Sequence, residues 1–152
     1  MILGINATKE AIFVAETHGA GQQFSVAKIQ RIKFQIGKAT DLADLLSNIA
    51  TLLNRHTSDS GVSASVLKCF GGQYGSSVEA IKAEAISELA AVQNGLSVKE
   101  VTPQSLKKAL NCIAGEKWQE CVKRMFNSDN RHNYWSQGAN GAVAAAFKAA
   151  AE

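Results

Sequence analysis

Cysteine is scarce in this sequence, and the few that occur form no recognisable metal or disulfide pattern. Cys69, Cys112 and Cys121 are odd in number, and no two of them have CxxC spacing. A disulfide framework and a zinc site are therefore not indicated, and we expect buried, reduced thiols. His56 and His132 have no second ligand at metal spacing. The sequence thus predicts no metal and no other cofactor.

The sequence also lacks a basic leader, a long apolar run, an internal repeat and a low-complexity linker. Its opening stretch, MILGINATKEAIFV, is largely apolar but contains Lys9 and Glu10. This stretch is far too short to span a bilayer, which takes about 20 apolar residues. We therefore expect no signal, no membrane partner and a cytoplasmic location. The length of 152 residues predicts one domain, residues 1–152, that can bury a core without disulfides.

Charge of either sign is not abundant. Charged residues make up 19% of the chain, the net charge is +3, and the pI is near 8.8. This mild basic excess permits nucleic acid or another polyanion as a partner, but it does not by itself indicate one. With 46% hydrophobic residues, the composition fits a globular chain.

The first part of the chain predicts three strands. Met1–Ala7 and Ala11–Glu16 are apolar runs separated by turn residues, and Gln22–Phe34 gives a third strand. Gly4 inside the first strand indicates that another element approaches closely there, since a side chain would stand in its way.

A helix is predicted next. Thr40 is expected to cap it, with Asp41 and Asp44 in the first turn complementing the helix dipole. The helical spacing of apolar residues predicts a stripe that faces the core. This stripe consists of Leu42, Leu45, Leu46, Ile49, Leu52 and Leu53.

The central stretch, Val66–Leu110, reads as strand, glycine loop, helix, strand and helix. Ser65–Phe70 is a short apolar run, and Gly71–Ser77 cannot stay in one regular element. Val78–Gln93 carries apolar residues every three or four positions, which predicts a helix. Leu96–Val101 predicts another strand, and two strands joined by a helix imply a parallel pair with a right-handed crossover.

Three more helices are expected after that strand. Pro103 fits the first turn of a helix that continues through Gln104–Leu110. Lys117–Phe126 and Gln137–Ala151 give two further helices, with a loop at Asn127–Tyr134 between them. The element order predicts an α/β fold, in which a mixed five-stranded sheet has helices on both faces.

This order is that of the RNase H-like superfamily, and three strings resemble its RuvC branch, the Holliday junction resolvases. Ile2–Asn6 (ILGIN) resembles the family's opening strand, which ends in a catalytic aspartate. Glu79–Leu110 resembles its helix, strand and lysine-containing helix. Gln137–Phe147 (QGANGAVAAAF) resembles its last helix, which carries two acidic residues three apart. The resemblance covers nearly the whole chain and implies a RuvC-like domain.

The resemblance also implies a degenerate active site, because this chain departs from the family's pattern at every acidic position. The first aspartate falls on Asn6, and the paired acids fall on Gln137 and Asn140. The glutamate that ends the fourth strand falls on Leu67 or Lys68. Phosphodiester hydrolysis by two metals needs converging carboxylates, and neutral amides are poor substitutes. We therefore expect a pseudo-nuclease without catalytic residues or metal.

Two roles are open for Lys68. If it points inward, its ammonium could occupy the former cation position, with the side-chain oxygens of Asn6 and Asn140 as acceptors. Otherwise it lies on the solvent side of an edge without a special partner, and this second role is the one we favour.

Two stretches are candidates for nucleic-acid binding. The glycine loop before the Val78–Gln93 helix could face a phosphate, and it matches a loop that approaches DNA in the resembled family. The basic stretch from Lys107 to Arg131 could contact a phosphate backbone. Glycine loops also serve turning alone, and charged helix faces are commonly just solvated. The residues expected to bind are Gly71, Gly72, Tyr74, Ser76, Ser77, Lys107, Lys108, Lys117, Lys123 and Arg124.

Three functions remain open on this evidence. The favoured one is a catalytically inactive RuvC-like domain that binds nucleic acid, in particular branched or structured DNA. The second is a protein-interaction or regulatory module on the same scaffold. The third is an active metal-dependent nuclease with a displaced site that uses Glu79, Glu84 or another acidic residue. The helix at 78–93 is apolar on more than one face, and the corresponding helix joins two copies in the resembled resolvases, so we expect a homodimer.

Overall fold

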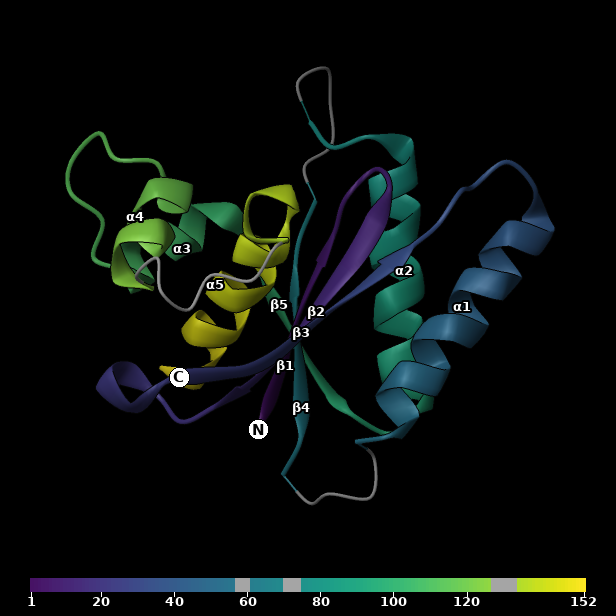
Figure 1. Ribbon diagram of the computed structural model, residues 1–152, viewed down its shortest axis with the longest axis horizontal. Coiled ribbons are helices and arrows are strands. Elements are labelled where there is room, and N and C mark those ends of the chain that lie inside the picture. The colour runs from purple at the N-terminus through teal and green to yellow at the C-terminus, as the bar shows by residue number, and fades with distance from the viewer. Residues whose placement is uncertain (57–60, 70–74, 127–133) are drawn as a thin grey trace.

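The architecture is a mixed sheet with helices on both faces (Figure 1). It is seen in a computed structural model that describes residues 1–56, 61–69, 75–126 and 134–152. Among these residues, five strands form one sheet in the order β3-β2-β1-β4-β5. The antiparallel pairs are β1–β2 and β2–β3, and the parallel pairs are β1–β4 and β4–β5. The strands are β1 (Ile2–Ala7), β2 (Ala11–His18), β3 (Ser25–Lys33), β4 (Ser63–Leu67) and β5 (Ser97–Val101). The predicted fold class is confirmed.

The helices divide between the two faces of the sheet. Helices α1 (Ala39–Asn54) and α2 (Val78–Gln93) cover one face, and α5 (Ala139–Ala150) covers the other. Helices α3 (Pro103–Ala109) and α4 (Trp118–Met125) pack against α5 (Figure 1). The described residues also contain two short 3-10 turns, η1 (Gly21–Gln23) and η3 (Trp135–Gln137). No helix in the described ranges is long and apolar enough to cross a membrane.

Alternation along β1 decides which side chain meets which helix layer. Leu3 and Ile5 lie in the core beneath α1 and α2, whereas Gly4 and Asn6 face α5. Because β1 is the middle strand of the sheet, both of its faces are covered. The predicted stripe on α1 supplies buried residues to the first of these cores, among them Leu45 and Ile49.

Helix α5 lies unusually close to β1. A β-carbon at Gly4 would stand only 1.9 Å from the carbonyl oxygen of Ala142 and 2.9 Å from the β-carbon of Ala146. The hydroxyl of Ser65 in β4 donates a hydrogen bond to the Ala145 carbonyl at 2.8 Å. The alanines of α5 make this approach possible because their side chains are small. The close approach expected at Gly4 is confirmed.

Two predicted helix starts are displaced. Helix α1 is capped at Lys38 rather than Thr40, because Asp41 Oδ2 accepts hydrogen bonds from the backbone nitrogens of Gly37 and Lys38 at 2.8 and 2.9 Å. These bonds hold the pKa of Asp41 below its ordinary value. Helix α5 starts two residues later than expected, because Gly138 has a φ of 148°, which is not a helical conformation. Strand β4 ends at Leu67, and Phe70 lies outside the described residues.

Replacing Gly4 by alanine is expected to destabilise the fold by at least about 3 kcal/mol, since overpacking costs about 1–3 kcal/mol even where side chains can adjust. Here the clash is with a helix backbone, which adjusts less easily. Urea unfolding of both proteins measures the difference. Gly37→Ala is the matched control, because its β-carbon would meet Asp41 Oδ2 at an ordinary 3.5 Å. The control should change stability by no more than about 1 kcal/mol; equal losses in the two variants would contradict this account.

Candidate functional site

One row of side chains crosses four strands on the α5 face, where β1 and β4 end. Asn6 is paired with Phe13, and Phe13 is paired with Arg31 on β3. The parallel register of β1 and β4 places Leu67 beside Asn6. The row therefore brings one amide, one guanidinium and two apolar side chains together, and none of the four carries a carboxylate.

The first turn of α5 rests directly on this row. Asn6 Nδ2 donates a hydrogen bond to the carbonyl oxygen of Gly138 at 2.8 Å. A β-carbon at Gly141 would lie 2.4 Å from Asn6 Nδ2 and 3.0 Å from Leu67 Cδ2. A β-carbon at Gly138 would lie 2.7 Å from the ring of Phe13. The two glycines thus let the helix approach the row without a clash.

Gln137 and Asn140 do not sit on one helix face as the predicted final helix required. Gln137 ends the 3-10 turn η3, is exposed, and accepts a hydrogen bond from Arg31 NH1 through its Oε1 at 2.9 Å. Asn140 belongs to the first turn of α5, where its Oδ1 accepts from the Gly141 nitrogen at 2.8 Å. The prediction of a continuous helix from Gln137 is wrong, because Gly138 separates the two residues.

Arg31 is the cation of the row, and sequence reasoning did not include it among the site residues. Its guanidinium lies 4.3 Å from the ring centroid of Tyr134 and also binds Gln137. These two contacts fix the plane of the guanidinium, which carries five N–H donors in all. The alternation of side chains along β3 could have indicated Arg31. It places Arg31 on the same strand face as the buried Ile29.

A cavity of about 970 Å³ opens beside the row, between the β1–β2 turn, the end of β3 and the start of α1. Arg31 and Gln137 line it together with side chains of both charge signs. Its charged lining residues are Lys9, Glu10, Arg31, Lys33, Asp41, Asp44 and Glu79. With cations and carboxylates nearly balanced, the cavity as a whole does not favour one charge sign, and any anion preference is local to Arg31.

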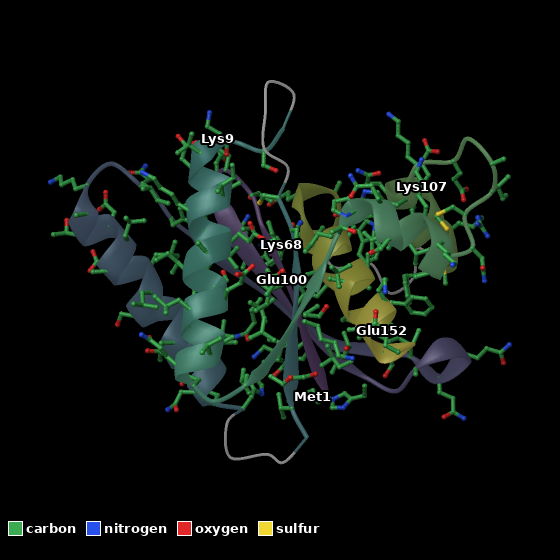
Figure 2. The ribbon with its side chains drawn as sticks, turned by 180° about the vertical axis from the view of Figure 1, so that it is seen from behind. Met1, Lys9, Lys68, Glu100, Lys107 and Glu152 are labelled. Carbon is green, nitrogen blue, oxygen red and sulfur yellow. The ribbon has the colours of Figure 1, made fainter. Side chains whose placement is uncertain are left out.

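Lys68 faces the opposite side of the sheet. Its Nζ lies 2.8 Å from Glu84 Oε1, 3.0 Å from Glu88 Oε1 and 3.5 Å from Glu100 Oε1 (Figure 2). The Glu88 contact is a hydrogen bond, whereas the Glu84 contact is an ion pair without hydrogen-bond alignment. Neither predicted role for Lys68 is found: its partners are three glutamates rather than the amides of Asn6 and Asn140, or solvent alone. The pleat explains this, because Leu67 faces α5 and the next residue must face α2.

The charges of this cluster shift one another's protonation. The pKa of Lys68 is raised, mainly by its contact with Glu84. Burial raises the pKa of Glu88, and the nearby ammonium partly offsets that effect. Because the pKa of Lys68 is raised in the fold, its contribution to stability is fully present below the ordinary lysine value of 10.5 and is lost only as pH rises through the folded value. The protonated Lys68 therefore contributes stability at neutral pH, whereas the raised pKa of Glu88 acts against it.

The cations predicted to bind nucleic acid lie on the outer helices. Exposed residues of α3, α4 and the turn before α4 include Lys107, Lys108, Lys117 and Lys123. Arg124 is also exposed, but its NH2 is paired with Glu116 Oε1 at 3.0 Å. In Figure 2, Lys107 and Lys9 both lie in the upper half of the view, on opposite sides of it. Lys9 belongs to the turn that follows β1.

In the described part of the glycine loop, two predicted binding residues have partners within the protein. The hydroxyl of Ser77 accepts a hydrogen bond from the Ala80 nitrogen at 3.1 Å, so it caps α2. Ser76 hydrogen-bonds the thiol of Cys69, whose pKa is raised by burial. Both hydroxyls thus have partners within the protein. Gly71, Gly72 and Tyr74, which complete the predicted set in this loop, lie outside the described residues.

Comparison with known proteins gives matches among solved structures alone: no protein-family profile and no curated protein matches. Thermus thermophilus RuvC superposes with a TM-score of 0.69 at 17% identity, over 97% of this chain and 91% of that one. T. thermophilus RuvC in complex with a Holliday junction substrate gives 0.68 at 16% identity, over 97% and 90%. The fold is RuvC-like. Identities this low establish the RuvC-like fold alone, and they confirm the predicted resemblance at that level.

Replacing Lys68 by methionine is expected to destabilise the protein by about 2 kcal/mol. Breaking a buried ion pair costs about 3–5 kcal/mol, and we reduce this figure because the Lys68 side chain is 32% exposed. The loss arises because Glu84, which is only 5% exposed, is left buried without its ion-pair partner. Urea unfolding measures it.

Two further variants make that measurement specific. Lys68→Met combined with Glu84→Gln should recover most of the lost stability, because the buried charge is then absent. Lys82→Met, on the exposed side of α2, removes the same charge elsewhere and should change stability by no more than about 0.5 kcal/mol. An unchanged stability of Lys68→Met would show that the cluster does not hold β4 to α2.

Proposed function

We propose that this chain is a catalytically inactive RuvC-like domain that binds nucleic acid, with a preference for branched or structured DNA. The observation that supports inactivity best is the hydrogen bond from Asn6 to the Gly138 carbonyl. This bond needs a donor at position 6, and an ionised aspartate has none. The carboxylate of an aspartate there would instead lie close to a carbonyl oxygen and be repelled by it. The contact between β1 and α5 therefore favours an amide side chain at position 6.

Leu67, rather than Lys68, is our choice for the position that holds a glutamate in the RuvC family. Leu67 faces α5 beside Asn6, whereas Lys68 faces α2. With Leu67, Asn6 and Asn140 all neutral, nothing at this place offsets the charge of two divalent ions. The alternative of a displaced nuclease site is weakened by Glu84, which is buried against Lys68.

The proposed binding surface combines the guanidinium of Arg31 with the cations of α3 and α4. Arg31 is held by Gln137 and Tyr134 with its plane fixed, which suits contact with a phosphate group. Lys107 and Lys108 are exposed on α3, which packs against α5. The Thermus protein with this fold has been solved with a Holliday junction substrate. That likeness supports a four-way junction as the first ligand to test.

Binding is tested by fluorescence anisotropy with a labelled four-way DNA junction and a matched duplex, over a salt series from about 50 to 200 mM. We expect preference for the junction and a steep salt dependence. The variant Lys107→Gln/Lys108→Gln should flatten the slope of log affinity against log salt by about 2, since two phosphate contacts are lost. Arg31→Gln should weaken binding in the same assay.

The charge-matched control is Lys28→Gln/Lys82→Gln, which removes two exposed lysines of β3 and α2 outside the proposed surface. Its slope should stay close to that of the unchanged protein. If no binding occurs at about 50 mM salt, where non-specific contacts are strong, the nucleic-acid proposal fails.

Magnesium is expected neither to promote cleavage of the bound junction nor to raise the melting temperature. A denaturing gel of the anisotropy samples tests the first point, and a thermal melt with and without Mg²⁺ tests the second. Cleavage that requires Mg²⁺ and is abolished by Glu79→Gln or Glu84→Gln would establish the displaced-nuclease alternative. The charge-neutral Asn94→Ala should behave like the unchanged protein.

We further propose that the chain forms a homodimer through α2. One stripe of this helix is apolar and exposed: Val78 is 64% exposed, Leu89 44% and Val92 62%, with Ile81 between them at 39%. Their spacing of three, eight and three residues keeps them on one side of the helix. A contiguous apolar stripe of this kind is typical of an interaction surface.

Leu89→Glu is expected to convert the dimer to a monomer, because it places a charge in the centre of the apolar stripe. Size-exclusion chromatography with light scattering, run over a range of concentrations, measures the mass. Lys28→Glu reverses an exposed charge on β3, away from α2, and should remain dimeric. A monomeric unchanged protein would contradict the dimer and favour a different protein on this surface, as in the protein-interaction alternative.

A further inference from the structure

Two cysteines and a glutamate converge outside the row, between α3 and α4. The Sγ atoms of Cys112 and Cys121 and a carboxylate oxygen of Glu116 all lie within 4.8 Å of one another. Cys121 is fully buried in α4, while Cys112 and Glu116 are half-buried in the connection before it. The sequence spacing, Cys-x3-Glu-x4-Cys, matches no common zinc motif. The arrangement therefore could not be predicted from the spacing of the cysteines.

The backbone of the connection brings these groups together. Asn111 has a φ of 51°, in the left-handed region, and turns the chain sharply at the end of α3. Gly115, with a φ of 83°, makes a second turn. The Glu116 nitrogen donates to the Ile113 carbonyl at 2.9 Å, and the Ile113 nitrogen donates to Glu116 Oε1 at 3.3 Å. The connection is therefore folded back on itself, with its Cys112 and Glu116 side chains directed at α4.

We propose that Cys112, Glu116 and Cys121 form a binding site for a thiophilic divalent cation, Zn²⁺ in particular, with a fourth position open to water or an external ligand. Zn²⁺ binds cysteine sulfur at about 2.3 Å and carboxylate oxygen at about 2.0–2.2 Å, usually with tetrahedral geometry. Two sulfurs on one tetrahedral ion lie roughly 3.8 Å apart, by this bond length. Ligand atoms already within 4.8 Å of one another can reach that arrangement by small side-chain rotations.

Glu116 distinguishes this cluster from a pair of cysteines poised to form a disulfide. A disulfide needs two sulfurs only, whereas here a carboxylate oxygen is held at the same place as both thiols. Mixed sulfur and oxygen ligands suit Zn²⁺ and its spectroscopic substitute Co²⁺ better than the hard cations Mg²⁺ and Ca²⁺. The two thiols lose their protons on binding, which gives the site enough negative charge for a divalent ion.

Arg124 already places a positive charge at this cluster. Its NH2 lies 3.0 Å from Glu116 Oε1 and 3.5 Å from the Cys121 sulfur. Because the Arg124 side chain is 49% exposed, its pair with Glu116 is weak, and the guanidinium can move into solvent as a metal ion enters. The site is independent of the nucleic-acid proposal, although Arg124 belongs to both surfaces.

Cobalt titration of the full chain tests the proposal. The protein is reduced, freed of metal with a chelator and titrated with Co²⁺, while thiolate-to-cobalt charge-transfer absorption is recorded. We expect one Co²⁺ per chain, loss of the absorption when Zn²⁺ is added, and a higher melting temperature with Zn²⁺. Absence of the charge-transfer band with excess Co²⁺ would overturn the proposal.

Variants assign the ligands. Cys112→Ser and Glu116→Gln should each weaken Co²⁺ binding at least about tenfold. Loss of a residue that only hydrogen-bonds a metal ligand already lowers metal affinity about 10–100-fold. Cys112→Ser should also reduce the charge-transfer intensity by about half, since one of two sulfurs is lost. Cys69→Ser and Glu120→Gln remove the same groups outside the cluster and should bind as the unchanged protein does.

Two outcomes in these variants would count against the site. Unchanged binding by Cys112→Ser and Glu116→Gln, in proteins whose circular dichroism is native, would show that the metal lies elsewhere. Formation of a Cys112–Cys121 disulfide in air, combined with no Co²⁺ binding by the reduced protein, would show that the cluster is a redox pair instead.

Discussion

The contact between the backbones of β1 and α5 is the constraint on which the rest of the structure depends. At Gly4 the strand and the helix are so close that no β-carbon fits between them, and the Ala142 carbonyl occupies that space. A helix this near to the middle strand of a sheet must be built from small residues, and α5 consists largely of alanine. The same closeness continues at Gly138 and Gly141, where the helix begins above the row.

Because of this packing, polar groups on the two faces of the sheet have different kinds of partner. On the α5 face there is little room for water, and Asn6 is satisfied by a helix carbonyl. On the α2 face the charges gather around Lys68, where Glu88 and Glu100 remain partly open to solvent. Leu67, the last residue of β4, and Lys68, which follows it, thus face opposite sides of the sheet. A shift of one residue in β4 would exchange them and bury the ammonium.

Local patterns in the sequence were sufficient to predict the secondary-structure elements and some contacts between them. Periodicity predicted the helices and strands, and Gly4 predicted that another element, found to be α5, approaches β1 closely. What could not be predicted were partners distant along the chain, such as Arg31 and Gln137, 106 positions apart. The cluster around Glu116 was hidden for another reason: it depends on left-handed turns at Asn111 and Gly115, and residue spacing does not reveal them. The choice between Leu67 and Lys68 needed the register of β4 against β1.

Asn6, Leu67 and Gly141 fit together so tightly that they constrain how this chain can evolve. A carboxylate in place of Asn6 alone would lose a hydrogen bond and face a carbonyl oxygen. A glutamate in place of Leu67 alone would bury a charge among the apolar side chains of this core. A single acidic substitution at either position is therefore expected to give a less stable protein. A requirement for stability alone then favours neutral residues at Asn6 and Leu67.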